Sequence, residues 1–377
     1  MRDASRLGFW PAALLLASIT IALTAGQGCA EGIRLDALKI PTVISVSGRP
    51  VSVELEGMVV RPDDGQPHPL AVLNHGSPRD ADDRPAMSPY RMWAQAIAFA
   101  RRGFVAVAFM RRGYGLSAGD WTESYGPCAN PNYAAAGRAG ASDIAAVAKF
   151  MIGQPYVSGD RWISVGVSAG GFATVALTAA APRGLAAAIV FAPGRGSTGP
   201  DNVCGASRLV SAFAEFGSTS RIPLLWVSAE NDHFFGPKLT AQLVGAFSNA
   251  GGHVSFVSAP PFGEDGHMLF STKGVPIWTP IVDRYLASNH LVLRDGLIDM
   301  PTPSLAPPPS LNGRGRDTFK TYLESGPNKA FAVGGGSHFG WATGRRSAGE
   351  AIHDALSFCT SNTSGKCTIV NVNNKPQ

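Results

Sequence analysis

Trp162-Ile163-Ser164-Val165-Gly166-Val167-Ser168-Ala169-Gly170 is the stretch that decides the fold of this chain. Its first six residues are almost continuously apolar, as in a strand that is buried on both faces of a parallel sheet. Gly166, Ala169 and Gly170 are small enough to permit a strained turn around Ser168, and residues 171–181 are long and apolar enough for a helix. The stretch therefore predicts a strand, a tight turn with Ser168 at its apex, and a helix.

Short apolar runs alternate with helical stretches on both sides of this motif. The predicted strands span residues 70–73, 104–109, 162–167, 186–191, 223–227 and 253–257. The predicted helices span residues 90–101, 141–152, 171–181, 206–216 and 239–249. This strand-helix order is typical of an open, doubly wound α/β sheet whose strands are mostly parallel. An alternating run at 51–60 predicts an antiparallel edge strand, and residues 277–288 predict a closing helix.

The composition is that of a folded protein with more than one unit. The chain has 377 residues, of which 45% are hydrophobic, and is therefore too apolar for disorder. Because a single core rarely grows past about 250–300 residues, we expect one large domain and one small one. The net charge of +5 is spread along the chain without a long basic run, so we expect no nucleic-acid partner.

A proline-rich segment separates the two expected domains. Five prolines between residues 301 and 309 mark a stiff linker. We expect a large α/β domain at 31–295, the linker at 296–312 and a small α+β domain at 313–377. In the small domain, helices are predicted near 318–323 and at 348–358, and strands at 329–333 and 368–372.

The N-terminus has the pattern of a secretory signal. Arg2 and Arg6 precede an apolar run at 7–25, and Gly28-Cys29-Ala30 supplies small residues for a signal peptidase. We therefore expect residues 1–30 to be removed and the protein to be exported to the periplasm or the extracellular space. The alternative is that the run is kept as a membrane anchor.

Cysteine usage fits an exported protein. Of the five cysteines, four follow residue 30, and an even number in an exported chain suggests two disulfides. Cys359 and Cys367 would close a short loop in the small domain, which leaves Cys128 and Cys204 to tie two loops of the large domain together. The alternative is four reduced, buried thiols.

Two segments match the pattern Gly-x-Ser-x-Gly, at 115–119 and 166–170. A nucleophilic serine of this type needs a buried strand before it and a helix directly after it. Ser168 has both, whereas Ser117 lies in a glycine-rich loop with no helix start. The sequence therefore favours Ser168 as a nucleophile and a turn role for Ser117.

An activated serine needs a base and a carboxylate that orients the base. In an open α/β sheet, such groups lie in the loops at the carboxyl ends of strands. Asp232 follows the strand at 223–227, and His267 lies in the loop after the last strand. We expect these two residues to complete a catalytic triad, with Glu230 and Asp201 as alternative acids.

Acyl transfer also needs N–H donors for the oxyanion. One expected donor is the backbone N–H of Ala169, at the start of the helix after Ser168. The second is expected in the loop that begins at His75, where Pro78 has no N–H. Ser77 is the first choice there and Gly76 the second, while His75 itself is expected to shape the loop.

Five motifs in this order resemble the α/β-hydrolase superfamily, and most closely its dienelactone-hydrolase-like and prolyl-oligopeptidase-like serine hydrolases. They are His75-Gly76-Ser77-Pro78, Arg112-Gly113-Tyr114-Gly115-Leu116-Ser117, Gly166-Val167-Ser168-Ala169-Gly170, Glu230-Asn231-Asp232 and Asp265-Gly266-His267. The resemblance covers about residues 45–290 and implies a sheet of about eight strands, the triad Ser168, Asp232 and His267, no cofactor and no metal. Dienelactone hydrolases proper use a cysteine where this chain has Ser168, so their substrate does not carry over.

The expected function is that of an exported serine hydrolase that cleaves small carboxylic esters. The longest insertion, 120–140, carries Trp121 and Tyr125 and would lie on the rim of a lidless site. Alternatives are an amidase, peptidase or thioesterase with the same triad, or an inert hydrolase fold that acts as a cell-envelope binding protein. The small domain resembles an extracytoplasmic module of bacterial secreted proteins, so contact with the cell envelope or with another protein is expected of it.

Overall fold

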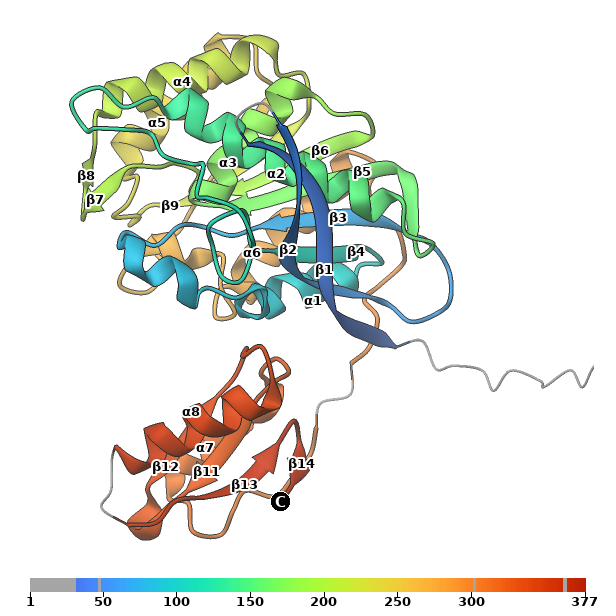
Figure 1. The fold of residues 1–377 in the computed structure, drawn as a ribbon, viewed down its shortest axis with the longest axis vertical. Helices are drawn as coiled ribbons and strands as arrows, with labels where there is room; N and C mark the ends of the chain where they lie inside the picture. The colour runs from blue at the N-terminus through green and yellow to red at the C-terminus, as the bar shows by residue number, and fades with distance from the viewer. Residues whose placement is uncertain (1–31, 47–48, 301–302, 362–364) are drawn as a thin grey trace, which may run out of the picture.

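The computed structural model describes residues 32–46, 49–300, 303–361 and 365–377. The predicted signal segment, 1–30, lies outside the described residues. The main unit is built on an eight-stranded sheet in the order β1-β2-β4-β3-β5-β6-β9-β10 (Figure 1). Its strands are β1 (Ile33–Val46), β2 (Arg49–Pro62), β3 (His68–Asn74), β4 (Val105–Phe109), β5 (Val157–Val167), β6 (Leu185–Phe191), β9 (Leu224–Ala229) and β10 (Val254–Ala259). The pairs β1–β2 and β2–β4 are antiparallel and all other neighbours are parallel, which confirms the predicted α/β class.

Helices cover both faces of this sheet because its central strands are apolar on both sides. Leu70 and Val72 of β3 pack into one core and Ala71 and Leu73 into the other, and all four are fully buried. The first core lies under α2 (Tyr133–Ile152), α3 (Ala169–Ala180), α4 (Ala206–Thr219) and α5 (Pro237–Asn249). The second core lies under α1 (Trp93–Ala100) and α6 (Val275–Ser288).

The sheet has the eight strands that the resemblance implies, but the residue pattern alone identified seven of them. The run expected as an edge strand, 51–60, lies inside the longer β2, and β1 forms the edge beside it, with Ile33 opposite Pro62. The sequence reading missed β1 because Pro41 interrupts its pattern. A proline is tolerated on an edge strand, where its missing N–H leaves no ladder bond unmade.

Helix α2 begins eight residues before the predicted start. The Oδ1 of Asn132 caps it by accepting from the N–H of Ala135 at 3.0 Å. Two glycines inside the helix made this part look like a loop. They are close-packing positions, because a Cβ at Gly137 would lie 2.9 Å from the ring of Phe216 and a Cβ at Gly140 would lie 2.7 Å from Ala173 Cβ.

The C-terminal unit has its own four-stranded antiparallel sheet, in the order β12-β11-β13-β14. Its strands are β11 (Ala330–Val333), β12 (Phe339–Ala342), β13 (Thr368–Val372) and β14 (Lys375–Pro376). One face packs on α8 (Ala348–Thr360), and Phe331 on the other face packs on α7 (Gly313–Glu324). The sequence reading missed β12 and β14, since one follows a glycine-rich turn and the other is two residues long.

Specific contacts hold the C-terminal unit against the main one. Arg346 donates from Nε to Glu56 Oε1 at 2.7 Å and from its terminal nitrogen to the carbonyl of Met87. The other oxygen of Glu56 accepts from the N–H of Leu116 at 2.9 Å. The small unit therefore contacts the same carboxylate that anchors the loop after β4.

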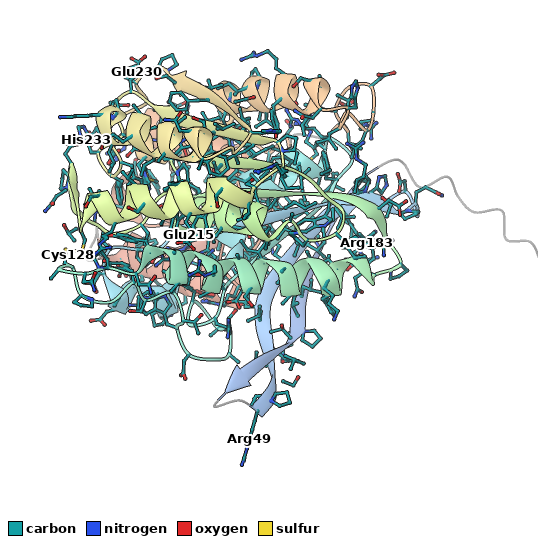
Figure 2. All side chains as sticks on the ribbon, turned by 90° about the horizontal axis from the view of Figure 1, so that it is seen from above. Arg49, Cys128, Arg183, Glu215, Glu230 and His233 are labelled. Carbon is teal, nitrogen blue, oxygen red and sulfur yellow. A yellow bond between two sulfur atoms is a disulfide. The ribbon has the colours of Figure 1, made fainter. Side chains whose placement is uncertain are left out.

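The four cysteines of the described residues form two pairs. The sulfur atoms of Cys128 and Cys204 lie at bonding distance, as do those of Cys359 and Cys367, which fits the two predicted disulfides. Figure 2 shows Cys128, Glu230 and His233 at one end of the main unit and Arg183 at the opposite end. Within the described ranges, no helix has both the length and the hydropathy needed to cross a membrane.

Two glycines on neighbouring helices give a test of this packing. A Cβ at Gly217 of α4 would lie 2.2 Å from the carbonyl oxygen of Phe247 in α5, whereas a Cβ at Gly245 of α5 would meet nothing within 4 Å. We expect Gly217→Ala to lower the free energy of unfolding by about 1–3 kcal/mol. Gly245→Ala, the matched control, should raise it by up to about 1 kcal/mol through helix propensity alone. Urea unfolding followed by tryptophan fluorescence measures both, and the same sign for the two variants would contradict this packing.

Candidate active site

Ser168 occupies the turn between β5 and α3. Its φ of 54° and ψ of −122° lie in a region that non-glycine residues rarely adopt. The turn is closely packed, because a Cβ at Gly166 would lie 2.4 Å from the carbonyl oxygen of Gly170, and a Cβ at Gly170 would lie 2.3 Å from those of Asn74 and His75. The small residues of the motif are therefore required by backbone contacts, and Ser168 lines a cleft of about 300 Å³.

Asp232 and His267 meet at the carboxyl end of the sheet. Asp232 follows β9, and His267 lies in a short 3-10 turn, Gly266–Leu269, after β10. The Nδ1 of His267 is 3.1 Å from Asp232 Oδ2. The N–H groups of Phe234 and Phe235 donate to Asp232 Oδ1 at 2.7 and 2.9 Å. These bonds fix the carboxylate and leave Nε2 of His267 without a bond to Asp232.

The surroundings keep Asp232 ionised. Burial alone would raise the pKa of its carboxyl group, but the hydrogen bond from His267 and the two backbone N–H groups outweigh this effect, and the pKa lies below its usual value. The ring of Phe234 stacks on the His267 imidazole at 3.9 Å between centroids. The imidazole is therefore oriented from one edge by a carboxylate and from one face by an aromatic ring.

Ser168 lies at the same end of the sheet as this pair, and each side chain is nearly buried, with 8% of Ser168 and 8% of His267 exposed. Among the described residues, no hydrogen bond joins Ser168 Oγ to His267. Such contacts are often long in free enzymes and shorten when a substrate binds.

Two of the residues that line the cleft with Ser168 are the predicted oxyanion donors, Ala169 and Ser77. Ala169 is the first residue of α3, and Ser77 lies in the loop after β3. Within the part of the chain that the structure describes, neither N–H donates to another residue. Gly76, the second choice for a donor, packs against the serine, since a Cβ there would lie 3.2 Å from Ser168 Cβ.

The competing sequence candidates have other contacts. Ser117 Oγ accepts from the N–H of Glu56 at 2.9 Å and donates to the carbonyl of Met110, so it anchors a loop. Asp201 pairs with His233 at 3.0 Å on the surface. No hydrogen bond or ion pair is found between the described Glu230 and His267.

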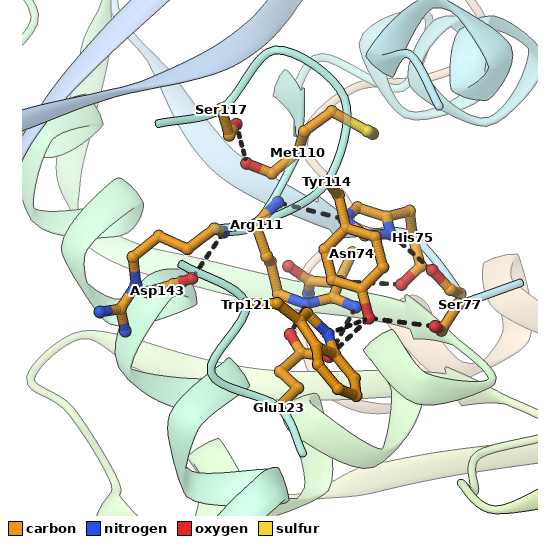
Figure 3. Close-up of polar contacts among 12 residues, drawn as sticks. Asn74, His75, Ser77, Met110, Arg111, Tyr114, Ser117, Trp121, Glu123 and Asp143 are labelled. Atoms are coloured by element: carbon orange, nitrogen blue, oxygen red, sulfur yellow. Dashed lines mark hydrogen bonds and ion pairs between the residues drawn. The ribbon is translucent and has the colours of Figure 1, made fainter. Parts of the chain in front are cut away.

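A buried charge cluster that the sequence reading missed supports the loop that carries His75 and Ser77 (Figure 3). Glu123 lies between Arg111 and Arg195 and forms ion pairs with both, and all three side chains are almost inaccessible to solvent. Arg111 also donates to the carbonyl of His75 at 2.8 Å. A pairing between residues 72 positions apart, such as Glu123 and Arg195, has no local sequence signature. The Arg111-Arg112 doublet at the end of a buried strand was the one available signal.

Hydrogen bonds extend this cluster to the cleft. The hydroxyl of Tyr114 is 3.1 Å from Glu123 Oε2 and 3.0 Å from Ser77 Oγ, and Nε1 of Trp121 donates to the same hydroxyl at 3.1 Å. His75 accepts from the N–H of Arg111 at 3.1 Å. Burial and the positive charge of Arg111 hold the pKa of His75 well below its usual value, so His75 stays neutral. Trp121 and Tyr125 are among the residues that line the cleft.

Glu123 gives the second test. Burial would raise the pKa of its carboxyl group, but Arg111 and Arg195 lower it to about 2. Because this value is below that of an unfolded glutamate, about 4.3, the ionised carboxylate stabilises the fold above that pH. The stabilisation is lost as pH falls toward 2. We expect Glu123→Gln to lower the free energy of unfolding at pH 7 by about 3–5 kcal/mol and to weaken its pH dependence below pH 4.5.

The matched control is Glu215→Gln, which removes an ion pair to Arg138 whose side chains are more than half exposed. It should change stability by no more than about 1 kcal/mol. Urea unfolding at a series of pH values measures both variants. Equal losses for the two, or a wild-type pH dependence in Glu123→Gln, would show that the buried cluster does not have the stated role.

Comparisons with known proteins agree with this architecture. The family model of the X-Pro dipeptidyl-peptidase (S15 family) matches residues 51–201. No curated protein matches. An acylaminoacyl peptidase solved with Z-Gly-Gly-Phe-chloromethyl ketone is similar over 70% of this chain and 43% of its own, with 15% identity and a TM-score of 0.50.

Two shorter proteins are similar over nearly their whole length. An esterase from Pyrococcus furiosus is matched over 68% of this chain and 93% of its own, with 13% identity and a TM-score of 0.47. A protein from Klebsiella pneumoniae described as a dienelactone hydrolase is matched over 69% and 99%, with 15% identity and a TM-score of 0.46. The strand order and the match to the peptidase structure together show that the chain has the α/β-hydrolase fold.

Proposed function

We propose that the chain is an exported serine hydrolase that cleaves carboxylic esters through an acyl-enzyme intermediate on Ser168. The observation that carries the proposal is a strained serine in the lining of a cleft. Ala169 and Ser77, whose N–H groups have no acceptor among the described residues, line the same cleft, and a hydrogen-bonded His267–Asp232 pair lies at the same end of the sheet. This combination supplies a nucleophile, an oxyanion site, a base and a group that orients the base.

In the first half of the reaction, Nε2 of His267 takes the proton of Ser168 Oγ while that oxygen attacks the ester carbonyl. The negative charge that develops on the carbonyl oxygen is stabilised by the N–H groups of Ala169 and Ser77. Asp232 stabilises the imidazolium without taking its proton. The imidazolium then gives the proton to the leaving alcohol, and the acyl group stays on Ser168.

In the second half, water takes the place of the alcohol. His267 removes a proton from the water as the water attacks the acyl carbon, and the same two N–H groups stabilise the second oxyanion. The C–O bond to Ser168 breaks and Ser168 recovers its proton from His267. The products are a carboxylic acid and the free enzyme.

Amide cleavage is the second candidate, because the matching family model is that of a peptidase and an acylaminoacyl peptidase has the same fold. The same residues would act, with His267 protonating a leaving amine. An open cleft of about 300 Å³ favours a small substrate of either kind. The export part of the proposal is supported by the N-terminal sequence pattern and by the two cysteine pairs at bonding distance.

The proposed nucleophile, Ser168, can be tested against Ser117, the serine of the other Gly-x-Ser-x-Gly motif. Ser168→Ala should abolish covalent labelling by a fluorophosphonate probe and lower hydrolysis of 4-nitrophenyl butyrate by about 10⁴-fold or more. Ser117→Ala alters the other Gly-x-Ser-x-Gly motif and should keep the labelling. Mass spectrometry of the labelled peptide identifies the site. A folded wild-type protein that takes no label would favour the inert binding-protein reading. A 4-nitroanilide of the same acid, cleaved faster than the ester, would favour the amidase.

The role of Asp232 can be tested by comparison with the two alternative acids, Asp201 and Glu230. Asp232→Asn keeps the shape of the side chain but removes the charge that fixes the His267 tautomer, so kcat should fall by about 10²–10⁴-fold. Asp201→Asn and Glu230→Gln change the two competing carboxylates and should leave kcat within a factor of about two, since neither contacts His267 in the described residues. If kcat fell strongly in either of these variants and only slightly in Asp232→Asn, the residue that orients His267 would be the other carboxylate and not Asp232.

A further inference from the structure

Three arginines line the cleft at Ser168, and the sequence reading anticipated none of them. They are Arg79, in the loop that carries Ser77, Arg84, in the short 3-10 helix Ala81–Ala86, and Arg195, after β6. No aspartate or glutamate belongs to the described lining of this cleft. The walls next to the nucleophile therefore carry positive charge only.

Arg79 is held in place beside the proposed base. Its guanidinium carbon lies 3.6 Å from the centre of the Phe234 ring. The same ring stacks on the imidazole of His267. The Nε and a terminal nitrogen of Arg79 donate to Ser197 Oγ at 3.2 and 2.9 Å. A cation over an aromatic face is stabilised by the ring quadrupole. These contacts orient the guanidinium without neutralising it.

Arg84 has an equivalent position beside the loop that carries Ser77. Its guanidinium carbon lies 3.7 Å from the centre of a Trp121 ring. Nε1 of Trp121 donates to the hydroxyl of Tyr114, which is 3.0 Å from Ser77 Oγ. A ring thus holds each of the two arginines, and each ring is linked to a different part of the proposed catalytic machinery.

Neither Arg79 nor Arg84 forms an ion pair with a carboxylate of the described residues. No carboxylate of the described chain lies within 4 Å of either guanidinium, although Asp80, Asp82 and Asp83 are their exposed chain neighbours. The Oδ1 of Asp80 instead accepts from the N–H of Asp82 at 2.9 Å.

The third arginine adds to the same excess. Arg195 shares Glu123 with Arg111, so this buried trio carries one net positive charge behind the cleft wall. The Nε–H of Arg195 has no acceptor among the described residues. Asp201, six residues after Arg195 in the chain, pairs with His233.

From this arrangement we infer that the cleft takes an ester that carries a carboxylate, which Arg79 and Arg84 receive while the ester carbonyl lies at Ser168. The inference rests on the proposed function and names its substrate class. A guanidinium offers two parallel N–H groups to the two oxygens of a carboxylate, and such charge-assisted bonds are strong and directional. A cleft of about 300 Å³ is at the small end for ligand sites, so the acid and the ester belong to one short molecule.

Two pairs of substrates test the inference. The first pair is 4-nitrophenyl hydrogen adipate and its methyl ester, which differ only in a carboxylate on the acyl side. The second is 4-butyryloxybenzoic acid and its methyl ester, which differ in a carboxylate on the alcohol side. We expect kcat/KM, corrected for uncatalysed hydrolysis, to be at least about ten-fold higher for the acid than for its methyl ester in one pair at low ionic strength.

The arginine variants show whether that preference comes from this cleft. The double variant Arg79→Gln/Arg84→Gln should lower the acid-to-ester ratio of kcat/KM by about ten-fold or more, mainly through KM for the acid. The double lysine variant should recover part of it. The ratio is independent of the fraction of folded enzyme. Arg183→Gln is the matched control, because Arg183 is exposed and precedes β6 at the opposite end of the sheet (Figure 2).

The possible outcomes separate this inference from the proposed function. Hydrolysis of the methyl esters without preference for the acid in either pair overturns the inference and leaves the proposed function standing. A preference that survives in the double glutamine variant, or that Arg183→Gln removes equally, also overturns it. Hydrolysis of none of the four esters by wild-type enzyme, with no fluorophosphonate label on Ser168, overturns the proposed function and the inference with it.

Discussion

The candidate site depends on the direct contact between the first turn of α3 and the end of β3. Gly170 lies so close to the carbonyl oxygens of Asn74 and His75 that no side chain fits between them. Asn74 secures this contact from below, because its buried Nδ2 donates to the carbonyl of Val165 at 3.1 Å and to Thr174 Oγ1 at 3.0 Å. One amide group thus joins β3, β5 and α3. As a result, the strained Ser168, the start of α3 and the Ser77 loop share one small volume.

Around this contact the protein uses buried charge where a simpler core would use apolar side chains. Burial removes water from Glu123 and its two arginines, which costs free energy. Their mutual attraction and hydrogen bonds offset that cost. The cluster holds the loop that carries His75 and Ser77 in place. Arg111 fixes His75, and Tyr114 contacts both Glu123 and Ser77. The same loop after β4 is anchored from outside by Glu56, which Arg346 of the C-terminal unit also contacts.

The sequence was informative where local pattern and local structure coincide. The apolar run, the small residues around Ser168 and the following helix are one continuous segment, so their structure could be predicted. The meeting of Asp232 and His267 could be expected because the carboxyl ends of parallel strands lie at one edge of a sheet. The edge strand with Pro41 and the glycine-containing start of α2 were missed, since tertiary packing overrides local propensity there. Glu123 and Arg195 could not be found, because their pairing depends on a fold that joins distant segments.

The arginines of the cleft show how binding and chemistry are joined in this architecture. Phe234 contacts Arg79 on one side and His267 on the other, and Trp121 contacts Arg84 and, through Tyr114, Ser77. One aromatic ring therefore separates Arg79 from the proposed base, and two rings separate Arg84 from the loop that carries Ser77. Since an aromatic ring is rigid, these platforms hold the cationic groups at little cost in side-chain entropy. An anion bound between the arginines would then contact guanidinium groups that rest on the rings next to His267 and Tyr114. Under the proposed function, recognition of a charged substrate and orientation of the reacting groups would thus depend on the same few side chains.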